Sequence, residues 1–492
     1  MAKQAGRMLL NAGWAAMILL LPVTSMPLVV RLVGSDAVAA PSGLILLALM
    51  VAWLIPSWLR GGRLPWTSVP LVVFVGVALG VTTLRAAFLD LPPFKGISAL
   101  RNSIQALLTL GVGVSFYLAG SAWGQRRDRL GTALRWINWS GAVVILYCLL
   151  QAGMWQFNHR YPQWMKDFHD LYSIGPLYRQ RVSGFTLEPS WLANQLNLLY
   201  LPIWIGAVVT RQSAHKLRWG KWIAEDGLLL GGVAALGLSL SRVGLLALFL
   251  LVGYGMLLWN VRLVRKIQES WQRRHASGGQ ARWVQGAVLG GMAVVYAGAL
   301  LGLGWVLSRL DPRMAQLFQF ELGSENPLLR YANQLMFAAR MVYWQAGWGV
   351  FTAHPWLGVG LGNAGFFLPD TLQGYAHGLF EVRDLLYRSG SLLNIKSIWV
   401  RLLAETGIVG FSVFLSWLVS LWFATLGLVR QSDRQLRMIG WVGQLVILAY
   451  LVEGFSVDTF AFPYPWLTLG WVSGAALIAA KEENKTAGSS GT

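Results

Sequence analysis

Long apolar runs recur along the whole chain, and they limit its possible folds more than any single motif does. About 20 apolar residues make a helix long enough to cross the roughly 30 Å hydrocarbon layer of a bilayer. Of the 492 residues, 55% are hydrophobic and only 12% are charged, which is too apolar for a water-soluble chain of this length. We therefore expect an all-α, polytopic membrane protein.

The apolar runs predict about twelve membrane-spanning helices. The predicted spans are Met8 to Val30, Leu44 to Leu59, Val69 to Phe88, Ile104 to Trp123, Ile137 to Trp155, Trp191 to Thr210, Gly227 to Leu240, Val243 to Val261, Val284 to Leu307, Ser397 to Val429, Met438 to Glu453 and Phe462 to Ala480. The first is expected to be a retained helix, because it is long and lacks a small-residue cleavage site. Together, residues 1–492 form one predicted integral membrane domain.

Two connections are much longer than the others, and long loops often carry function. They are a first loop, 156–189, and a large loop, 308–396, which precedes the last three spans at 397–480. Within the large loop Arg340, Trp344 and Trp348 recur at helical spacing, so we expect a small group of surface helices there.

Clusters of lysine and arginine occur in every second connection between the predicted spans, and they therefore lie on one side of the membrane. The positive-inside rule assigns the basic side to the cytoplasm, which places both termini inside and both long loops outside. The short cytoplasmic loops hold much of the excess positive charge, so the formal net charge of +19 does not require a nucleic-acid partner.

Metal, cofactor and nucleotide motifs are absent from the sequence. The six histidines include no HExxH pattern, the single cysteine Cys148 lies in an apolar run, and there is no GxxxxGK[ST]. The glycine-rich run from Gly358 to Asn363 lacks the lysine of a phosphate loop, so its spacing favours a tight turn. We expect no metal and no cofactor.

Arginines lie next to predicted outer membrane ends, at Arg242, Arg340 and Arg401. Arginine grips phosphate with two parallel hydrogen bonds, and a diphosphate carried on a lipid would lie at this depth. The alternative is that these arginines reach the interface or pair with a carboxylate such as Glu405, Glu453 or Asp458.

Three sequence blocks occur in the order known from one family. They are LSLSRVGLLAL at 238–248, HPWLGVGLGN at 354–363 following Arg340, and LLAETGIVGF at 402–411. This set resembles the O-antigen ligase and Wzy-type polymerase superfamily. The resemblance implies a membrane glycosyltransferase that uses undecaprenyl-diphosphate glycans on the periplasmic face of the bacterial inner membrane, without a metal or a nucleotide sugar.

The resemblance also implies roles for individual residues. By position, Arg242 and Arg340 match arginines thought to hold the donor diphosphate and to neutralise its growing charge. Ligases usually carry a histidine about nine residues before the Glu of the ETG block, where this chain has Lys396. A lysine acts as a base only with a strongly lowered pKa, so Lys396 favours a polymerase and is better suited to bind a second diphosphate.

The end of the first loop, from Arg179 and Arg181 to Glu188, resembles a segment of polymerase relatives. Glu188 is the candidate to accept the proton of an attacking sugar hydroxyl, with a helix first-turn charge as the equal alternative. Further candidates for substrate binding are His354, Arg401, Glu405 and Trp344, whose indole could stack on a sugar or serve in packing.

Three functions compete. A polymerase would join lipid-linked repeat units, a ligase would move a finished glycan to a lipid core or protein, and a transporter would show two matched halves with interrupted helices. The polar residues gather in unequal loops and the two halves do not correspond, which argues against the transporter, while Lys396 favours the polymerase over the ligase. The expected partners are the lipid-linked donor, the glycan acceptor and the bilayer, and the sequence leaves open whether a chain-length regulator or flippase binds.

Overall fold

The computed structural model describes residues 2–33, 40–89, 91–215, 218–274 and 338–489, with a few single positions between 286 and 309. The ninth predicted span, 284–307, and the part of the large loop at 308–337 therefore lie outside the described residues, apart from those positions.

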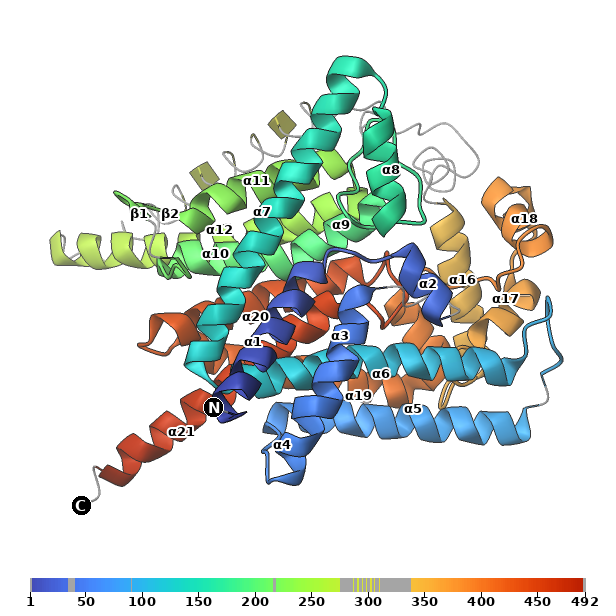
Figure 1. Cartoon of the computed structure of the whole chain (residues 1–492), viewed down its shortest axis with the longest axis horizontal. Helices are drawn as coiled ribbons and strands as arrows, with labels where there is room; N and C mark the ends of the chain where they lie inside the picture. Colours follow the sequence, from blue (N-terminus) through green and yellow to red (C-terminus); the bar gives the residue numbers. More distant parts are fainter. Residues whose placement is uncertain are drawn as a thin grey trace.

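Helices dominate the first half of the chain (Figure 1). They are α1 (Ala2–Leu20), α2 (Pro27–Val33), α3 (Pro41–Leu49), η1 (Met50–Leu54), α4 (Ile55–Leu59), η2 (Trp66–Ser68), α5 (Val69–Phe88), α6 (Ala99–Gly124), α7 (Arg127–Asn158), α8 (Gln163–Tyr172), α9 (Pro189–Gln195), η3 (Leu196–Tyr200), α10 (Leu201–Thr210), α11 (Ala224–Ser239) and α12 (Arg242–Arg274). The predicted first span differs from the structure, because α1 ends at Leu20 and a separate helix begins at Pro27.

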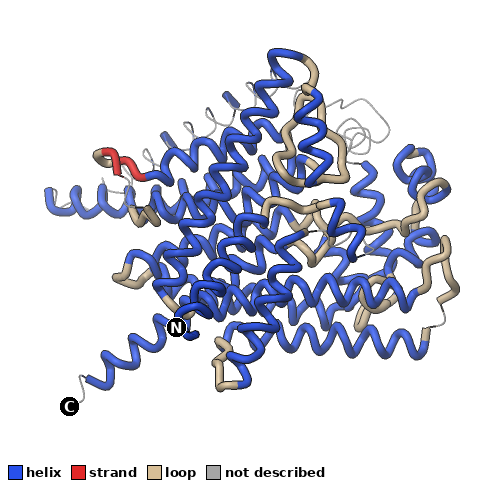
Figure 2. The backbone as a smooth tube through the Cα atoms, in the orientation of Figure 1, coloured by secondary structure: helices blue, strands red, loops and turns tan. Residues whose placement is uncertain are grey.

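The second half is also helical, and the short hairpin shown in red in Figure 2 precedes it, between α10 and α11. The hairpin pairs β1 (Arg218–Trp219) with β2 (Trp222–Ile223) in antiparallel register. The later helices are α16 (Ala338–Ala353), α17 (Ala364–Thr371), η5 (Gly374–Gly378), α18 (Phe380–Tyr387), α19 (Ile398–Val429), α20 (Arg434–Glu453) and α21 (Pro463–Ser489). The helical character expected of the large loop is present in α16, α17 and α18.

Seven helices within the described residues are long and apolar enough to cross a membrane. They are Pro41–Leu59, Trp66–Phe88, Ala99–Gly124, Arg127–Asn158, Pro189–Thr210, Ile398–Val429 and Arg434–Glu453, and each coincides with a predicted span. A shorter apolar helix, Arg242–Leu258, coincides with the eighth. The chain is thus a helical protein of membrane-spanning character, whereas the expected count of about twelve spans stays a prediction.

Small residues let α6 and α21 approach closely at the centre of the bundle. A Cβ atom on Gly470 would lie 2.4 Å from the main-chain oxygen of Tyr117, and one on Gly474 would lie 2.4 Å from that of Ser121. Within a membrane such close contact between helices stabilises association through van der Waals packing, because lipid tails supply little hydrophobic drive.

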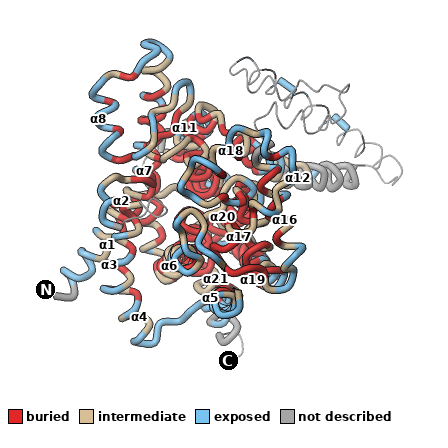
Figure 3. Tube along the Cα trace, turned by 90° about the vertical axis from the view of Figure 1, so that its right-hand side faces the viewer, coloured by how far each residue is buried: buried red, intermediate tan, exposed pale blue. Residues whose placement is uncertain are grey.

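Apolar side chains also cover the outside of the bundle, as expected if lipid surrounds it. Buried positions gather around α20 and α21, while the helices at the edge expose large apolar residues (Figure 3). Examples on α3, α4 and α5 are Leu44, Leu47, Ile55, Val72, Val73, Leu79 and Leu84.

The two ends of α20 differ in their surroundings. At its start, Asp433 accepts a 2.6 Å salt bridge from Arg127, which also pairs at 2.7 Å with Glu482. Its 20 residues span about 30 Å, because a helix rises 1.5 Å per residue. At its far end, after Glu453, begins the loop 454–462. The candidate site lies around this loop, away from the arginine-rich end.

Candidate functional site

The helix α19 breaks at Gly407, inside the third sequence block. This residue has φ 64° and ψ −171°, a conformation open almost only to glycine. The two amides after it leave the helix: Ile408 donates to the main-chain oxygen of Pro355 at 2.8 Å, and Val409 to that of Trp356 at 3.3 Å. A Cβ on Gly407 would lie 2.2 Å from the Trp356 oxygen. The break therefore lets the second block dock onto the helix.

The glycine-rich run completes this exchange of backbone hydrogen bonds. The amide of Val359 donates to the main-chain oxygen of Ala404 at 3.0 Å, and that of Gly360 to Glu405 at 2.9 Å. These two carbonyls are the ones that the break leaves without their helical donors. A Cβ on Gly358 would lie 2.5 Å from the carbonyl carbon of Glu405. The run is a tight turn, as its spacing predicts, and it locks the second and third blocks together.

A buried ion pair lies just before the break. The Nε of Arg401 is 2.8 Å from Oε2 of Glu405, with side chains only 16% and 4% exposed. The guanidinium also donates to the main-chain oxygen of Asp458 and lies 5.5 Å from the centre of the Phe460 ring. The structure therefore shows Arg401 paired with a carboxylate, which is the alternative that the sequence offered for this residue. A buried charge requires such a partner.

The loop 454–462 contacts three cationic residues from two parts of the chain, Arg340 in one and Lys396 and Arg401 in the other. Nη1 of Arg340 donates to the hydroxyl of Ser456 at 2.6 Å, and the amide of Lys396 donates to Oδ2 of Asp458 at 3.2 Å. The guanidinium of Arg401 donates to the main-chain oxygen of the same Asp458. The guanidinium groups of Arg340 and Arg401 and the backbone of Lys396 thus lie at one short loop, where the two arginines could hold an anionic group.

Arg242 begins α12 at the tip of the hairpin that α11 and α12 form. Two residues further on, the oxygen of Gly244 accepts a 2.9 Å hydrogen bond from the side chain of Asn197. The same amide group donates to Oε1 of Glu453 at 2.7 Å, immediately before the loop 454–462. A single buried asparagine therefore fixes the start of the Arg242 helix to the helix end from which the site loop emerges.

The first-loop candidates are divided between two places. Nε of Arg181 donates to the main-chain oxygen of Ser239 at 3.0 Å, beside the tip of the Arg242 hairpin. Glu188 is the N-cap residue of α9, and its carboxylate accepts a hydrogen bond from the hydroxyl of Ser190. Arg179 is exposed and lines a different cavity. Glu188 therefore lies immediately before the first turn of α9, and its role as proton acceptor stays a prediction.

His354 and Trp344 make aromatic contacts. The imidazole of His354 lies 5.6 Å from the ring of Phe367, and burial together with the nearby Arg85 lowers its pKa. The indole of Trp344 lies 5.4 Å from the ring of Phe455 in the loop 454–462. His354 therefore stays neutral at pH 7, and Trp344 belongs to the surroundings of the site loop.

A cavity of about 430 Å³ opens beside this loop. Arg401 and Glu405 are the predicted site residues among its described lining. The other polar side chains that line it are Asn102, Gln105, Thr109, Ser391, Asn394, Asp458 and Thr459. The cavity combines one cation, which is paired with Glu405, two carboxylates and several neutral groups, and these hydrogen-bonding groups suit a polyhydroxylated ligand.

Sequence reasoning missed several residues that build this cavity. The side chain of Asn102 donates to the main-chain oxygen of Gly362, and Ser103 donates to Oδ1 of Asn363 at 3.1 Å. Both come from α6, and no local pattern marks them. Asp458 was considered only as a partner for arginine, although its place in a loop after a membrane span was a usable signal.

Lys95 was also missed, and it fixes the rim of the cavity. Its ammonium donates to the main-chain oxygens of Ser389 at 2.9 Å and Ser391 at 3.0 Å, and also to that of Leu385. Burial lowers the pKa of Lys95. A lysine capping these carbonyls holds the loop that closes one side of the cavity.

Possible metal ligands do not cluster in the described part of the chain, where no group of three or more His, Cys, Asp and Glu side chains is placed to hold an ion.

Comparison with known families finds a match that spans the three sequence blocks. A family model described as O-Antigen ligase (Wzy_C) matches residues 227–415, which include α11, α16 and the interlocked blocks of the turn and α19. No curated protein matches the sequence significantly. The resemblance seen in the sequence is confirmed to this extent: residues 227–415 of this membrane protein match the O-Antigen ligase family model.

Proposed function

We propose that the protein polymerises undecaprenyl-diphosphate-linked oligosaccharide repeat units in the bacterial inner membrane, with its site facing the periplasm and both termini in the cytoplasm. The family match supports a glycosyltransferase of the ligase and polymerase type. Lys396, at the position where ligase relatives usually have histidine, is the observation that favours a polymerase. Lysine and the arginines around the same loop suit two diphosphate groups, one on the donor and one on the acceptor.

The reaction would be a nucleophilic substitution at the anomeric carbon of the donor glycan. The non-reducing-end hydroxyl of the acceptor forms the new C–O bond, while the bond between that carbon and the diphosphate oxygen breaks. Undecaprenyl diphosphate leaves with the bonding electron pair. Arg340 and Arg242 would neutralise the charge that develops on it, and each could contribute about 2 to 4 kcal/mol of transition-state stabilisation.

The proton of the attacking hydroxyl needs an acceptor near the cavity. Glu188, the candidate from the sequence, caps α9 and is outside the described cavity lining. Glu405 lines the cavity but is paired with Arg401. Asp458 lines it too, and its carboxylate accepts the backbone hydrogen bond from Lys396. We therefore favour Asp458 as the proton acceptor.

Incubation of the purified protein with lipid-linked repeat units from its source tests the proposal. A ladder of longer lipid-linked glycans is expected, and it should be lost in the variants Arg340→Ala and Arg242→Ala. Arg388→Ala is the matched control, because Arg388 is an exposed arginine at the end of α18. No ladder from the wild-type protein in the presence of donor and acceptor would contradict the polymerase.

Ligase activity is the second candidate, because the matching family model carries that description. Adding a core lipid or protein acceptor to the same reaction distinguishes the two. Transfer to the added acceptor without a ladder would make the protein a ligase.

A further inference from the structure

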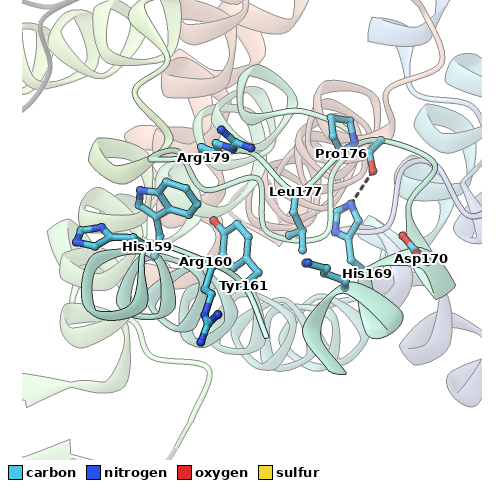
Figure 4. A pocket seen from close by; sticks show the side chains of 11 residues that line it. His159, Arg160, Tyr161, His169, Asp170, Pro176, Leu177 and Arg179 are labelled. Atoms are coloured by element: carbon cyan, nitrogen blue, oxygen red, sulfur yellow. Dashed lines mark hydrogen bonds between the residues drawn. The ribbon is translucent and has the colours of Figure 1, made fainter. Parts of the chain in front are cut away.

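A second cavity, of about 570 Å³, lies at the outer end of α7. It is enclosed by the end of α7, by α8 and by the loop that follows α8 (Figure 4). Within the described residues it has no lining residue in common with the cavity beside the loop 454–462. Its volume is within the range of about 300 to 1,000 Å³ found for small-molecule sites.

The lining of this cavity is rich in positive charge. Arg160, Lys166 and Arg179 line it together with a single carboxylate, that of Asp170. All three cations are exposed, and in the described part of the chain none of them forms an ion pair with an acidic side chain. In Figure 4 Arg179 lies on one side of the Tyr161 ring and Arg160 on the other. An anion entering here would meet unpaired cations from two sides.

Aromatic rings form another part of the wall. The rings of Trp155 and Tyr161 lie 5.6 Å apart at 44°. The hydroxyl of Tyr161 donates to the main-chain oxygen of Tyr178 at 2.8 Å, which fixes the ring against the loop. His169 likewise holds the loop, through a 2.8 Å hydrogen bond between Nε2 and the oxygen of Gly175. A held aromatic face offers apolar contact to the C–H groups of a sugar ring.

The loop that lines this cavity continues directly to the candidate site. Two residues after Arg179, Nε of Arg181 donates to the main-chain oxygen of Ser239 at 3.0 Å. The next amide, that of Val182, donates to the oxygen of Leu238 at 3.2 Å. Both acceptors are in the first sequence block, just before the hairpin tip. The segment 179–182 therefore connects the cavity to the hairpin that carries the site arginine.

We propose that this cavity binds an acidic sugar of the glycan, one that bears a carboxylate. The inference rests on the proposed function, since it assumes that the protein handles lipid-linked glycans. Three cations against one carboxylate favour an anionic ligand, and the aromatic wall favours a sugar over a lipid phosphate, which would leave that wall unused. A carboxylate sugar uses both parts of the lining.

Direct binding to the full-length protein in phosphatidylcholine nanodiscs tests the inference. The probes are a short oligogalacturonate and a maltooligosaccharide of equal length, measured by calorimetry. We expect the acidic probe to bind at least about tenfold more tightly, with a preference that falls as salt is raised. The triple variant Arg160→Gln, Lys166→Gln, Arg179→Gln should lose the preference.

A matched variant controls for the loss of three positive charges. Arg101→Gln, Arg383→Gln, Arg388→Gln removes three exposed arginines that are outside this cavity's lining, and it should keep the preference. The six substituted positions are exposed, and unchanged thermal unfolding will verify that both variants fold.

Two results would overturn the inference. One is equal binding of the acidic and neutral probes by the wild-type protein. The other is that phosphatidylglycerol binding depends on the same three cations, while the protein binds the oligogalacturonate no more tightly than the maltooligosaccharide. That result would assign the cavity to a lipid headgroup. Because binding is measured without turnover, either result leaves the polymerisation assay unaffected. Failure of that assay would in turn contradict the proposed function by itself.

Discussion

Nε of Arg401 lies 2.8 Å from Oε2 of Glu405, one helical turn further along α19, and both side chains are largely buried. Removal of one partner leaves an uncompensated buried charge, which costs about 3 to 5 kcal/mol of folding free energy. We expect Arg401→Met to destabilise the protein by this amount in detergent unfolding, and Arg401→Met with Glu405→Gln to recover part of the loss.

Arg126 and Asp128 provide the control for this prediction. They form a 3.0 Å pair whose side chains are 53% and 65% exposed. An exposed pair contributes only about 0 to 1 kcal/mol, so Arg126→Met should have little effect. Equal losses from Arg126→Met and Arg401→Met would argue against a special role for the buried pair.

Gly407→Ala should disrupt the docking of the glycine-rich turn on α19. The backbone conformation alone costs a non-glycine residue about 1 to 3 kcal/mol, and the new Cβ would meet the Trp356 carbonyl. We expect a lower unfolding temperature and loss of glycan polymerisation. Gly427→Ala on the same helix is the control, since a Cβ there meets no atom within 4 Å and alanine favours helix. Similar behaviour of the two variants would refute this explanation.

Asp458→Asn should slow polymerisation by about 10² to 10⁴-fold if Asp458 accepts the proton. The asparagine oxygen can still accept from the Lys396 amide, so the loop should keep its structure. The loss should appear in kcat, with KM little changed. Glu188→Gln is the comparison, and a greater loss in that variant would return the role to Glu188.

Acid should loosen α8 through His169. Burial lowers the pKa of this imidazole below its usual value of about 6.5, although contacts with Gly175 and Asp170 act in the opposite direction. The unfolded segment then binds more protons than the folded one near pH 6, so local stability is full above pH 7 and falls as the pH is lowered.

Hydrogen-exchange protection factors for α8 between pH 7.5 and pH 5 measure this effect. Protection should decrease in the wild-type protein and change less in His169→Gln, where no imidazole titrates. Constant protection across that range in the wild-type protein would be incompatible with the proposed cause.

Sequence patterns predicted the spans better than the site. The turn from Gly358 to Asn363 was predicted from its glycines, because positive φ angles are a local property. Its docking surface on α19 was not, since the main-chain oxygens that it contacts become available only through the break at Gly407. The sequence also left the partner of Arg401 open. A charge in a membrane helix needs a partner, but the sequence alone does not identify the residue that supplies it.

The sequence by itself determined the membrane-spanning character and the approximate positions of most described spans, because the length of an apolar run is a property of consecutive residues. It also determined the family resemblance, which is carried by three short blocks. Only the tertiary structure decided that Arg340, Arg401 and the backbone of Lys396 contact one loop, and that Glu188 is the N-cap residue of α9. Packing between helices sets those contacts, and it depends on the shapes of residues that are far apart in the chain.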